Sequence, residues 1–303
     1  MSFKVKILVS GASGLVGHHL VPKLNEHGHD VFSLVRKTTQ NEREILWHSE
    51  QGFIDSELKK IENFDAVVHL AGAGIADERW TKMRKRIIKE SRTVGTRVLV
   101  ENLARLNNPP KTFLSASAIG YYGHRGDEVL TENSLPGNDF LSNVCVEWEA
   151  AAQNAQTFGA RVVKMRIGIV LTPAGGALKE MLGPFKMGVG GRVGSGKQFV
   201  SWIEIGDLIR AIEFALENEN LQDAVNATAP NPVRNAEFAA ILGHVLHRPS
   251  LVATPEFALR LMFGELADAL LFSSARVIPT KLQGANFKFQ FENIEDALRH
   301  LLE

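Results

Sequence analysis

Residues 4–20 read KVKILVSGASGLVGHHL, a β-branched run followed by three spaced glycines and the start of an amphipathic segment. The glycines form a G-x-x-G-x-x-G pattern between a predicted strand and a predicted helix. In this setting the first glycine makes a tight turn, the second lets a pyrophosphate approach the backbone, and the third lets helix and strand pack closely. Free N–H groups at the helix start then hold the anion, so the pattern predicts a dinucleotide site. The expected contacts are Gly11, Ser13, Gly14, Leu15, Val16 and Gly17.

The second predicted strand, residues 30–36, ends in a basic pair, Arg36 and Lys37. An acid about 20 residues after the glycines would bind the adenosine ribose 2′-hydroxyl of NAD. A guanidinium instead grips a 2′-phosphate through paired hydrogen bonds, whereas an acid would repel it. The pair therefore predicts NADP(H) rather than NAD(H); the alternative is that both are solvated cations at a strand end.

The rest of the chain predicts an α/β fold. Strand-like runs at 43–49, 64–72, 111–118 and 160–171 alternate with helical segments. Near-continuous apolar strands separated by helices indicate a doubly wound parallel sheet, which we assign to residues 1–171. A glycine-rich segment (172–202) and amphipathic helices at 205–218, 235–247 and 294–303 predict a smaller, mostly helical substrate lobe over 172–303. Some of its segments are expected to return to the first domain.

The composition is that of an ordinary globular protein. The chain has 303 residues, 45% of them hydrophobic, and a formal net charge of +0. A net charge of zero gives the chain no overall electrostatic attraction to nucleic acid or to an anionic membrane. The single cysteine, Cys145, is typical of a reducing compartment. No segment reaches the ~18 apolar residues that a spanning helix needs. We therefore expect a cytoplasmic protein with a small-molecule substrate.

Further motifs follow the later predicted strands: HLAGAG at 69–74, SASAIGYYG at 115–123 and RIGIVL at 166–171. With the glycine loop, they resemble the extended short-chain dehydrogenase/reductase superfamily. DFLSNVCVEWEAAA (139–152) and GSGKQFVSWI (194–203) are similar to its epimerase-like subgroup, the predicted nucleoside-diphosphate-sugar epimerases or cell-division-inhibitor-like proteins. The resemblance implies a Rossmann fold, hydride transfer at nicotinamide C4, and further cofactor contacts from Leu70, Ala71, Gly72 and Arg166.

The resemblance breaks at the helix predicted over 138–152. Members of the superfamily use Ser or Thr to orient the reacting oxygen, Tyr to carry the proton, and Lys to lower the tyrosine pKa. The serine carries over to Ser117, with Ser115 as a second candidate. The Tyr and Lys positions hold Leu141 and Cys145 in the register that we favour; the registers one residue either side give Phe140 with Val144 or Ser142 with Val146. Tyr-x-x-x-Lys occurs nowhere in the chain. We expect Cys145 to be buried rather than reactive.

Three other side chains are candidate proton carriers. Tyr121 and Tyr122 follow the fifth predicted strand, at the carboxyl end of the sheet, where ligands bind in open α/β folds. Either could act as an acid if His124 or Arg125 lowered its pKa; the alternative is a pair of aromatic residues in the pocket wall. Glu204 is a candidate to face the substrate. Asp207, three residues later, is expected to cap the helix that follows.

Two basic segments offer anion ligands. GRVGSGKQ at 191–198 has the spacing of an ATPase phosphate loop but Gln198 in place of Ser or Thr, so we reject that interpretation. Its Arg192 and Lys197 are candidates to bind a substrate anion; the alternative is a flexible loop. The segment 79–92 predicts a solvated basic helix, from which Arg79 and Arg92 are candidates to line the substrate cleft. The histidines show no spacing that indicates a metal site.

Two functions are compatible with this pattern. The first is an NADP(H)-dependent epimerase or oxidoreductase acting on a small polar substrate such as a nucleotide sugar. The second is a non-catalytic NADPH-binding regulator or redox sensor with a protein partner, which the missing Tyr and Lys favour.

Overall fold

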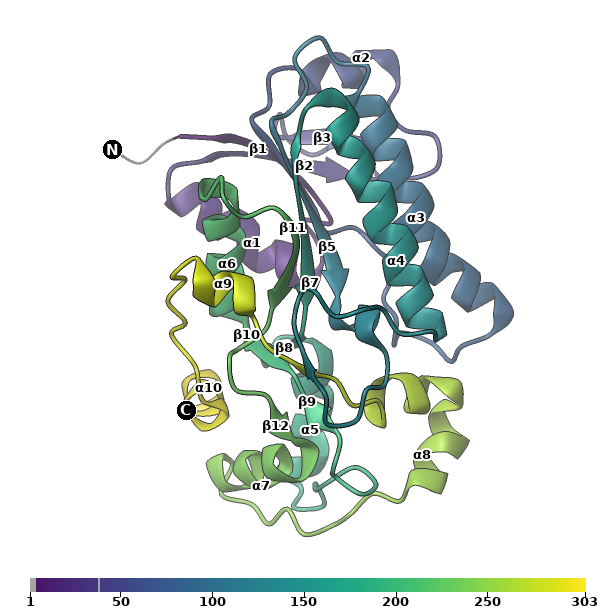
Figure 1. The fold of residues 1–303 in the computed structure, drawn as a ribbon, viewed down its shortest axis with the longest axis vertical. Coiled ribbons are helices and arrows are strands. Elements are labelled where there is room, and N and C mark those ends of the chain that lie inside the picture. Colours follow the sequence, from purple (N-terminus) through teal and green to yellow (C-terminus); the bar gives the residue numbers. More distant parts are fainter. Residues whose placement is uncertain (1–3, 38) are drawn as a thin grey trace.

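The computed structural model describes residues 4–37 and 39–303. At its centre is a seven-stranded sheet in the order β3-β2-β1-β4-β5-β7-β11, with every neighbouring pair parallel (Figure 1). The predicted doubly wound α/β fold is therefore confirmed. The strands are β1 (Lys6–Ser10), β2 (Asp30–Val35), β3 (Glu44–Leu46), β4 (Ala66–His69), β5 (Thr112–Ala118), β7 (Arg161–Ile167) and β11 (Asp223–Ala227).

Helices cover both faces of this sheet. α1 (Leu15–Glu26) and α6 (Ile205–Glu217) pack on one face, and α3 (Lys82–Leu103) and α4 (Phe140–Gln153) pack on the other (Figure 1). Each face has its own apolar cluster, with Leu20 and Leu208 in the first and Leu99 and Ala152 in the second. Burial on both faces explains why the strands are apolar almost throughout.

The order of the strands creates a crevice at the sheet's carboxyl edge. From β1 the chain moves outward through β2 and β3, and then continues on the other side through β4, β5 and β7. The direction reverses between β1 and β4, which is where ligands bind in folds of this kind. The glycine loop follows β1, and residues 70–74 follow β4, so the two predicted cofactor segments meet there.

The chain leaves the large sheet after β7. The segment predicted as one strand over 160–171 is two strands, because β8 (Ile169–Leu171) turns away to pair with β10 (Trp202–Glu204). Gly168 lies at the break, where a methyl group would be 2.7 Å from the Ser201 carbonyl oxygen. The smaller lobe below it in Figure 1 contains α5 (Gly176–Lys186), α7 (Asn235–Val245), α8 (Glu256–Phe263) and α10 (Ile294–Leu302).

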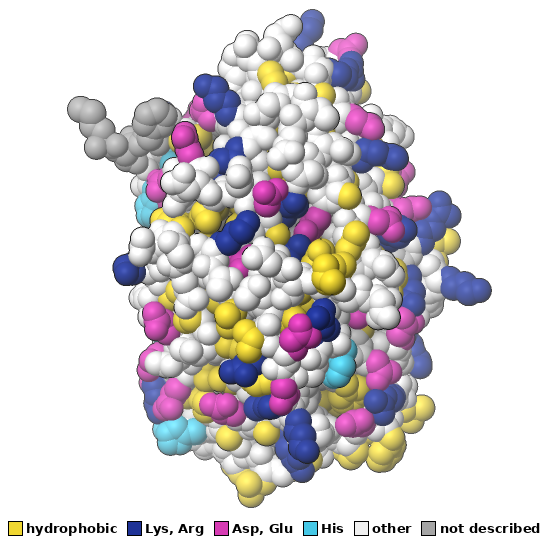
Figure 2. Space-filling model, viewed as in Figure 1, with side chains coloured by type: hydrophobic (Ala, Val, Ile, Leu, Met, Phe, Trp, Pro, Cys, Tyr) yellow, Lys and Arg dark blue, Asp and Glu magenta, His cyan; other side chains and the backbone are white. Residues whose placement is uncertain are grey.

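The remaining elements are short, and the pair of β6 (Val129–Leu130) with β13 (Arg276–Val277) joins the two lobes. A further pair forms between β9 (Phe199–Val200) and β12 (Val233–Arg234). The short helices are α2 (Asp55–Leu58) and α9 (Thr280–Gly284). Among the helices described, none has both the length and the apolar character to cross a bilayer. Basic and acidic side chains are interspersed over the face shown in Figure 2.

Candidate functional site

The glycine loop joins β1 to α1 and packs against the loop after β4. Gly11 has a φ of +75°, and a methyl group there would lie 2.8 Å from the Ala71 nitrogen. Gly17 is more crowded, since a methyl group would lie 2.3 Å from the Gly11 carbonyl oxygen. Both positions therefore require glycine, the first for the turn and the second for the close approach of helix and loop.

The start of α1 presents backbone N–H groups to the crevice. Its N-cap residue, Gly14, has no side chain to occupy them. The first bond of the helix runs from His18 N to Gly14 O at 2.8 Å, so the N–H groups of Leu15, Val16 and Gly17 precede it. Unused donors and the positive end of the helix dipole favour a phosphate at this point.

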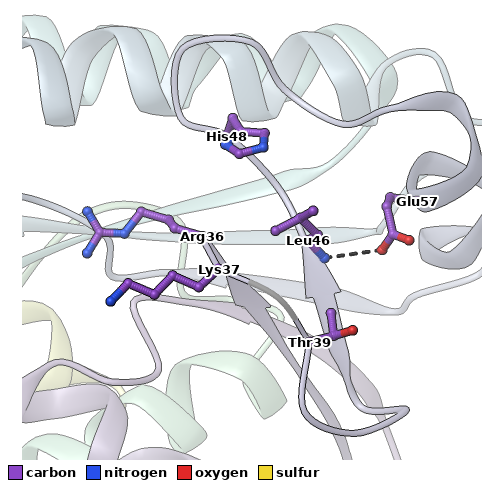
Figure 3. A pocket seen from close by; sticks show the side chains of 6 residues that line it. All are labelled: Arg36, Lys37, Thr39, Leu46, His48 and Glu57. Atoms are coloured by element: carbon purple, nitrogen blue, oxygen red, sulfur yellow. Dashed lines mark hydrogen bonds between the residues drawn. The ribbon is translucent and has the colours of Figure 1, made fainter.

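The basic pair after β2 lines a pocket of about 540 Å³. Figure 3 shows Arg36 and Lys37 extending side by side from the end of β2, with Glu57 on the opposite side. The Glu57 carboxylate accepts hydrogen bonds from Leu46 N at 3.1 Å and Lys60 Nζ at 2.6 Å. The two cations are therefore available to an anionic ligand.

Four residues of this pocket were not among the predicted ones: Thr39, Leu46, His48 and Glu57. His48 follows β3, the strand beside β2 in the sheet. Neighbouring parallel strands end at the same edge of a sheet. The residues after β3 could therefore have been predicted to lie beside the residues after β2.

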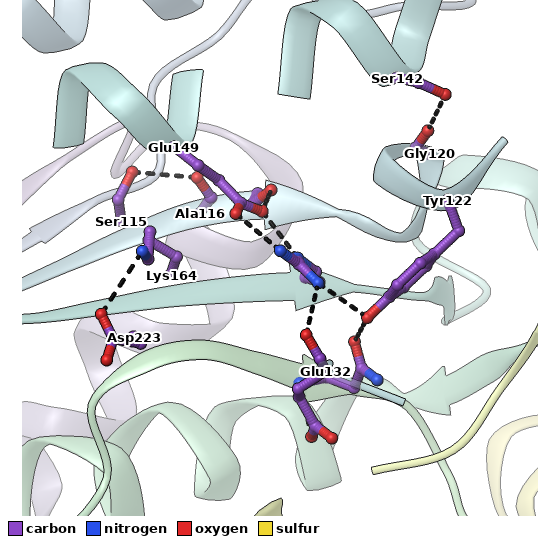
Figure 4. Close-up of polar contacts among 12 residues, drawn as sticks. Ser115, Ala116, Gly120, Tyr122, Glu132, Ser142, Glu149, Lys164 and Asp223 are labelled. Carbon is purple, nitrogen blue, oxygen red and sulfur yellow. Dashed lines mark hydrogen bonds and ion pairs between the residues drawn. The ribbon is translucent and has the colours of Figure 1, made fainter. Parts of the chain in front are cut away.

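Behind this edge lies a buried hydrogen-bond network (Figure 4). Arg166 donates from Nε to Glu149 Oε1 at 2.8 Å, from Nη2 to Glu149 Oε2 at 2.9 Å, and from Nη1 to the Tyr122 hydroxyl at 3.0 Å. Ser117 Oγ donates to Glu149 Oε1 at 2.7 Å, and the Tyr122 hydroxyl donates to Asn226 Oδ1 at 2.6 Å. The network joins β5, α4, β7 and β11.

Three predicted site residues are buried members of this network, and their side chains do not face a ligand. Tyr122 is fully buried, and desolvation raises its pKa to about 12, so it is a poor acid. Ser117 is buried and bonded to a carboxylate rather than open to a ligand. Arg166, expected at the cofactor, has its nitrogens bonded to protein partners and points into the interior.

Tyr121 lies on the outer side of the same network. It is half-buried, and its ring covers Arg166, whose Cζ is 3.4 Å from the ring centroid. The ring also meets Tyr122 edge to face, with centroids 5.3 Å apart. These contacts fix the ring. The Tyr121 hydroxyl has no hydrogen-bond partner within residues 4–37 and 39–303, so it remains available to a ligand.

The residues expected to tune the tyrosines are occupied elsewhere. Arg125 bonds Glu128 at 2.7 and 2.8 Å, and it also bonds the Leu135 carbonyl. His124 Nδ1 accepts a hydrogen bond from Ser274 N at 3.1 Å. Neither Arg125 nor His124 is hydrogen-bonded to a tyrosine hydroxyl in these contacts, which do not support the expected role.

Glu204 and Asp207 differ from their predicted roles. Glu204 is 2% exposed, and its Oε2 accepts a hydrogen bond from Asp207 N at 2.9 Å, so Glu204 caps α6. Asp207, predicted as the cap, accepts hydrogen bonds from Gln290 N and Phe291 N at 2.9 Å each. Burial raises the pKa of the Glu204 carboxyl. The prediction that Glu204 faces the substrate is wrong, because its carboxylate is buried in the cap.

The helix predicted over 138–152 is confirmed as α4, which carries Leu141 and Cys145. Asp139 caps the helix, with its Oδ1 accepting from Ser142 N at 2.8 Å. Leu141 and Cys145 lie against Gly120, where a methyl group would be 3.5 Å from Leu141 Cβ and 3.9 Å from Cys145 Sγ. Cys145 is buried as expected, and desolvation raises its pKa to about 12. Neither residue can carry a proton at neutral pH.

Two further groups lie outside the buried network. Arg192 and Lys197 are exposed on the loop between α5 and β9, where Arg192 Nη1 donates to Ser195 O at 2.9 Å. They remain candidates to bind an anion.

His29, Glu213 and Glu217 bring metal-ligating atoms within 4.8 Å of one another before β2, at the opposite end of the strands. Histidine spacing did not predict this group.

Comparison with known proteins covers both lobes. Residues 7–227 match the NAD dependent epimerase/dehydratase family, and residues 254–301 match a domain of unknown function. An epimerase family protein of Mycobacterium bovis is 41% identical over 292 residues, covering 96% of each chain. The crystal structure of a human epimerase family protein with NADPH has a TM-score of 0.89, with 32% identity over 98% of each chain. A nucleoside-diphosphate sugar epimerase from Corynebacterium glutamicum has a TM-score of 0.81 and 33% identity, covering 99% of this chain and 59% of that one.

Proposed function

Since the chain belongs to the NAD dependent epimerase/dehydratase family, we propose that it binds NADP(H) in the crevice between β1 and β4. One observation carries the proposal: the N–H groups at the start of α1 and the cations Arg36 and Lys37 follow adjacent strands of one sheet edge. The N–H groups suit a pyrophosphate, and the cations suit a 2′-phosphate. The NADPH found in the human relative supports the same cofactor.

The preference for NADPH is tested at Arg36. Arg36→Ala is expected to raise the NADPH dissociation constant about ten- to hundredfold, because a charge-assisted hydrogen bond to phosphate is lost. The NADH dissociation constant should stay as in the parent protein. Calorimetric titration with both cofactors measures the two values. Arg43→Ala is the matched control, since Arg43 is exposed and pairs with Asp30 at the other end of β2. Equal losses for NADPH and NADH would contradict the 2′-phosphate role.

We propose further that the protein is an epimerase or oxidoreductase for a small polar substrate such as a nucleotide sugar. When bound, the nicotinamide supplies or accepts the hydride. The chain must then move a proton at the reacting oxygen. Of the predicted carriers, Tyr122 and Glu204 are in buried hydrogen bonds, which leaves the Tyr121 hydroxyl for this role. Ser117, predicted to orient the reacting oxygen, is also in a buried hydrogen bond.

Replacement of this hydroxyl tests the catalytic proposal. Tyr121→Phe is expected to lower kcat about 10²–10⁴-fold, because a positioned proton carrier is removed. The NADPH dissociation constant should not change, since the ring and its stacking on Arg166 remain. With a panel of sugar nucleotides and carbonyl compounds, NADPH absorbance measures net oxidation or reduction. Chromatography of the sugar nucleotides measures epimerisation, which regenerates the cofactor. Ser117→Ala, which loses a buried bond to Glu149, serves as a comparison. Unchanged turnover in Tyr121→Phe would exclude this role.

A second candidate function is an NADPH-binding regulator without turnover. The observation in its favour is that Leu141 and Cys145 lie where the proton carriers of relatives are expected, packed against Gly120. This function requires NADPH binding, a conformational response and a protein partner. NADPH turnover with any member of the panel would exclude it.

A further inference from the structure

Arg92, on α3, reaches the crevice from the side opposite the glycine loop. Its Nη1 donates to Ala73 O at 2.9 Å and to Ile88 O at 3.1 Å. A methyl group at Gly72 would lie 3.1 Å from Arg92 Cζ, so the guanidinium lies directly against the loop after β4. It also approaches α4, with Cζ 5.2 Å from the Trp148 ring centroid.

The Arg92 charge has no close anion. Within the described ranges, no carboxylate oxygen lies within 4 Å of it, and its Nε and Nη2 have no hydrogen-bond partner. Neither nitrogen is among the unpartnered polar atoms sealed in the interior. Burial lowers the Arg92 pKa, and the charge of Arg84 lowers it further, while the more distant Asp77 raises it. Partial burial of a cation without an anionic partner costs free energy, and a bound anion would reduce that cost.

Two other arginines of low exposure have the carboxylate partner that Arg92 lacks. Arg166 pairs with Glu149 at 2.8 Å, and Arg84 pairs with Asp77 at 3.1 Å. Arg161 resembles Arg92 in donating to carbonyls, those of Ala215, Leu216 and Leu221. Nitrogens without a hydrogen-bond partner also occur on Arg84 and Arg210, but those atoms are sealed in the interior, whereas Nε and Nη2 of Arg92 are not.

The position of Arg92 connects it to the proposed reaction. Gly72 and Ala73 directly follow Ala71, which contacts the glycine loop at Gly11. On the other side, Arg92 Cζ lies 5.2 Å from the ring centroid of Trp148 on α4, and Cys145 of the same helix packs against Gly120. Gly120 belongs to the short helix Ile119–Tyr122 that carries Tyr121. The guanidinium thus lies between the loop after β4 and the turn with the proposed proton carrier.

We propose that Arg92 binds an oxyanion of the substrate, a carboxylate or a phosphate group, through Nε and Nη2. The proposal rests on the proposed function, because it assigns the substrate class of the same crevice. The planar fork of a guanidinium matches an oxyanion with two parallel hydrogen bonds. The substrate class is then small anionic carbonyl or hydroxy compounds, oriented by Arg92 with the reacting oxygen toward Tyr121.

The experiment titrates NADPH-loaded protein with inorganic phosphate and, separately, with acetate. Nitrogen-15 NMR follows the Arg92 Nε–H signal, which is assigned by its absence in Arg92→Lys, and the Trp148 indole N–H signal beside it. We expect a saturable shift of both signals with at least one anion. Arg92→Gln should weaken the response of Trp148 about tenfold or more, as for the loss of a hydrogen bond to a charged group. Arg97→Gln is the control, since Arg97 is exposed on the same helix beside Glu101.

NADPH titration of the same variants separates the two proposals. We expect Arg92→Gln to bind NADPH as the parent protein does. NADPH binding without any anion-dependent shift of Arg92 Nε–H would overturn the inference and leave the proposed function in place. A loss of NADPH affinity as large as the loss of anion affinity would also overturn it, because Arg92 would then serve the cofactor. A parent protein that does not bind NADPH would overturn the proposed function, and the anion titration is repeated without cofactor for that case. The parent titration does not depend on a variant that folds.

Discussion

Replacement of Glu149 by alanine is expected to lower the free energy of unfolding by about 3–5 kcal/mol, because it leaves the Arg166 charge buried and unpaired. The two side chains are 9% and 4% exposed, and they form a two-pronged pair at 2.8 and 2.9 Å. The change also removes the acceptor of Ser117 Oγ. Urea denaturation followed by circular dichroism measures the loss.

The adjacent turn of α4 provides the control for this prediction. Glu147 pairs with Lys89 at 2.7 Å, and both side chains are nearly half exposed. Glu147→Ala should cost less than about 1 kcal/mol, since exposed pairs contribute little. Replacing both Glu149 and Arg166 with methionine should recover part of the loss, because no unpaired charge remains. Equal effects of Glu149→Ala and Glu147→Ala would contradict a structural role for the buried pair.

Gly17→Ala is expected to weaken NADPH binding about ten- to hundredfold, the effect of 1–3 kcal/mol of overpacking at the cofactor loop. The added methyl group would lie 2.3 Å from Gly11 O and 2.6 Å from Ala12 Cα, and backbone atoms cannot rotate away from it. Either the loop or the start of α1 must shift, which moves the N–H donors from the pyrophosphate. Calorimetric titration of NADPH measures the change.

Gly183→Ala is the matched control. Gly183 lies inside α5, and apart from its chain neighbours a methyl group there would meet nothing within 4 Å. This change should leave NADPH binding as it was, and we expect no gain in stability, because a Cβ directly before Pro184 opposes the helix propensity of alanine. A Gly17→Ala variant that bound NADPH as tightly as Gly183→Ala would show that the loop tolerates the shift.

The features that could be predicted from sequence depend on neighbours along the chain. The glycine spacing after an apolar run and the basic pair after the second strand are local signals, and both lie where they were expected. The break at Gly168 was missed because its cause, the Ser201 carbonyl, is 33 positions away along the chain (201 − 168). Apolar runs alone cannot show where a strand leaves its sheet.

Polar partnerships were harder to predict. Glu149 pairs with Arg166 across 17 positions, and nothing in either local sequence marks the two as buried partners. The roles of Glu204 and Asp207 differed although α6 begins at Ile205, as the predicted range 205–218 has it. The residue before that start is Glu204, whereas residue type favoured Asp207 as the cap, since aspartate is a preferred N-cap residue.

The return of β11 to the large sheet has a consequence for how the chain folds as it is synthesised. β7 ends at Ile167, but its outer partner begins at Asp223, after α5, β8, β9, β10 and α6 have been made. Until then β7 presents an open edge, which other chains can pair with. Parallel pairing between such distant segments forms slowly, because a long loop must close first. The large sheet is therefore completed only after part of the second lobe has been synthesised.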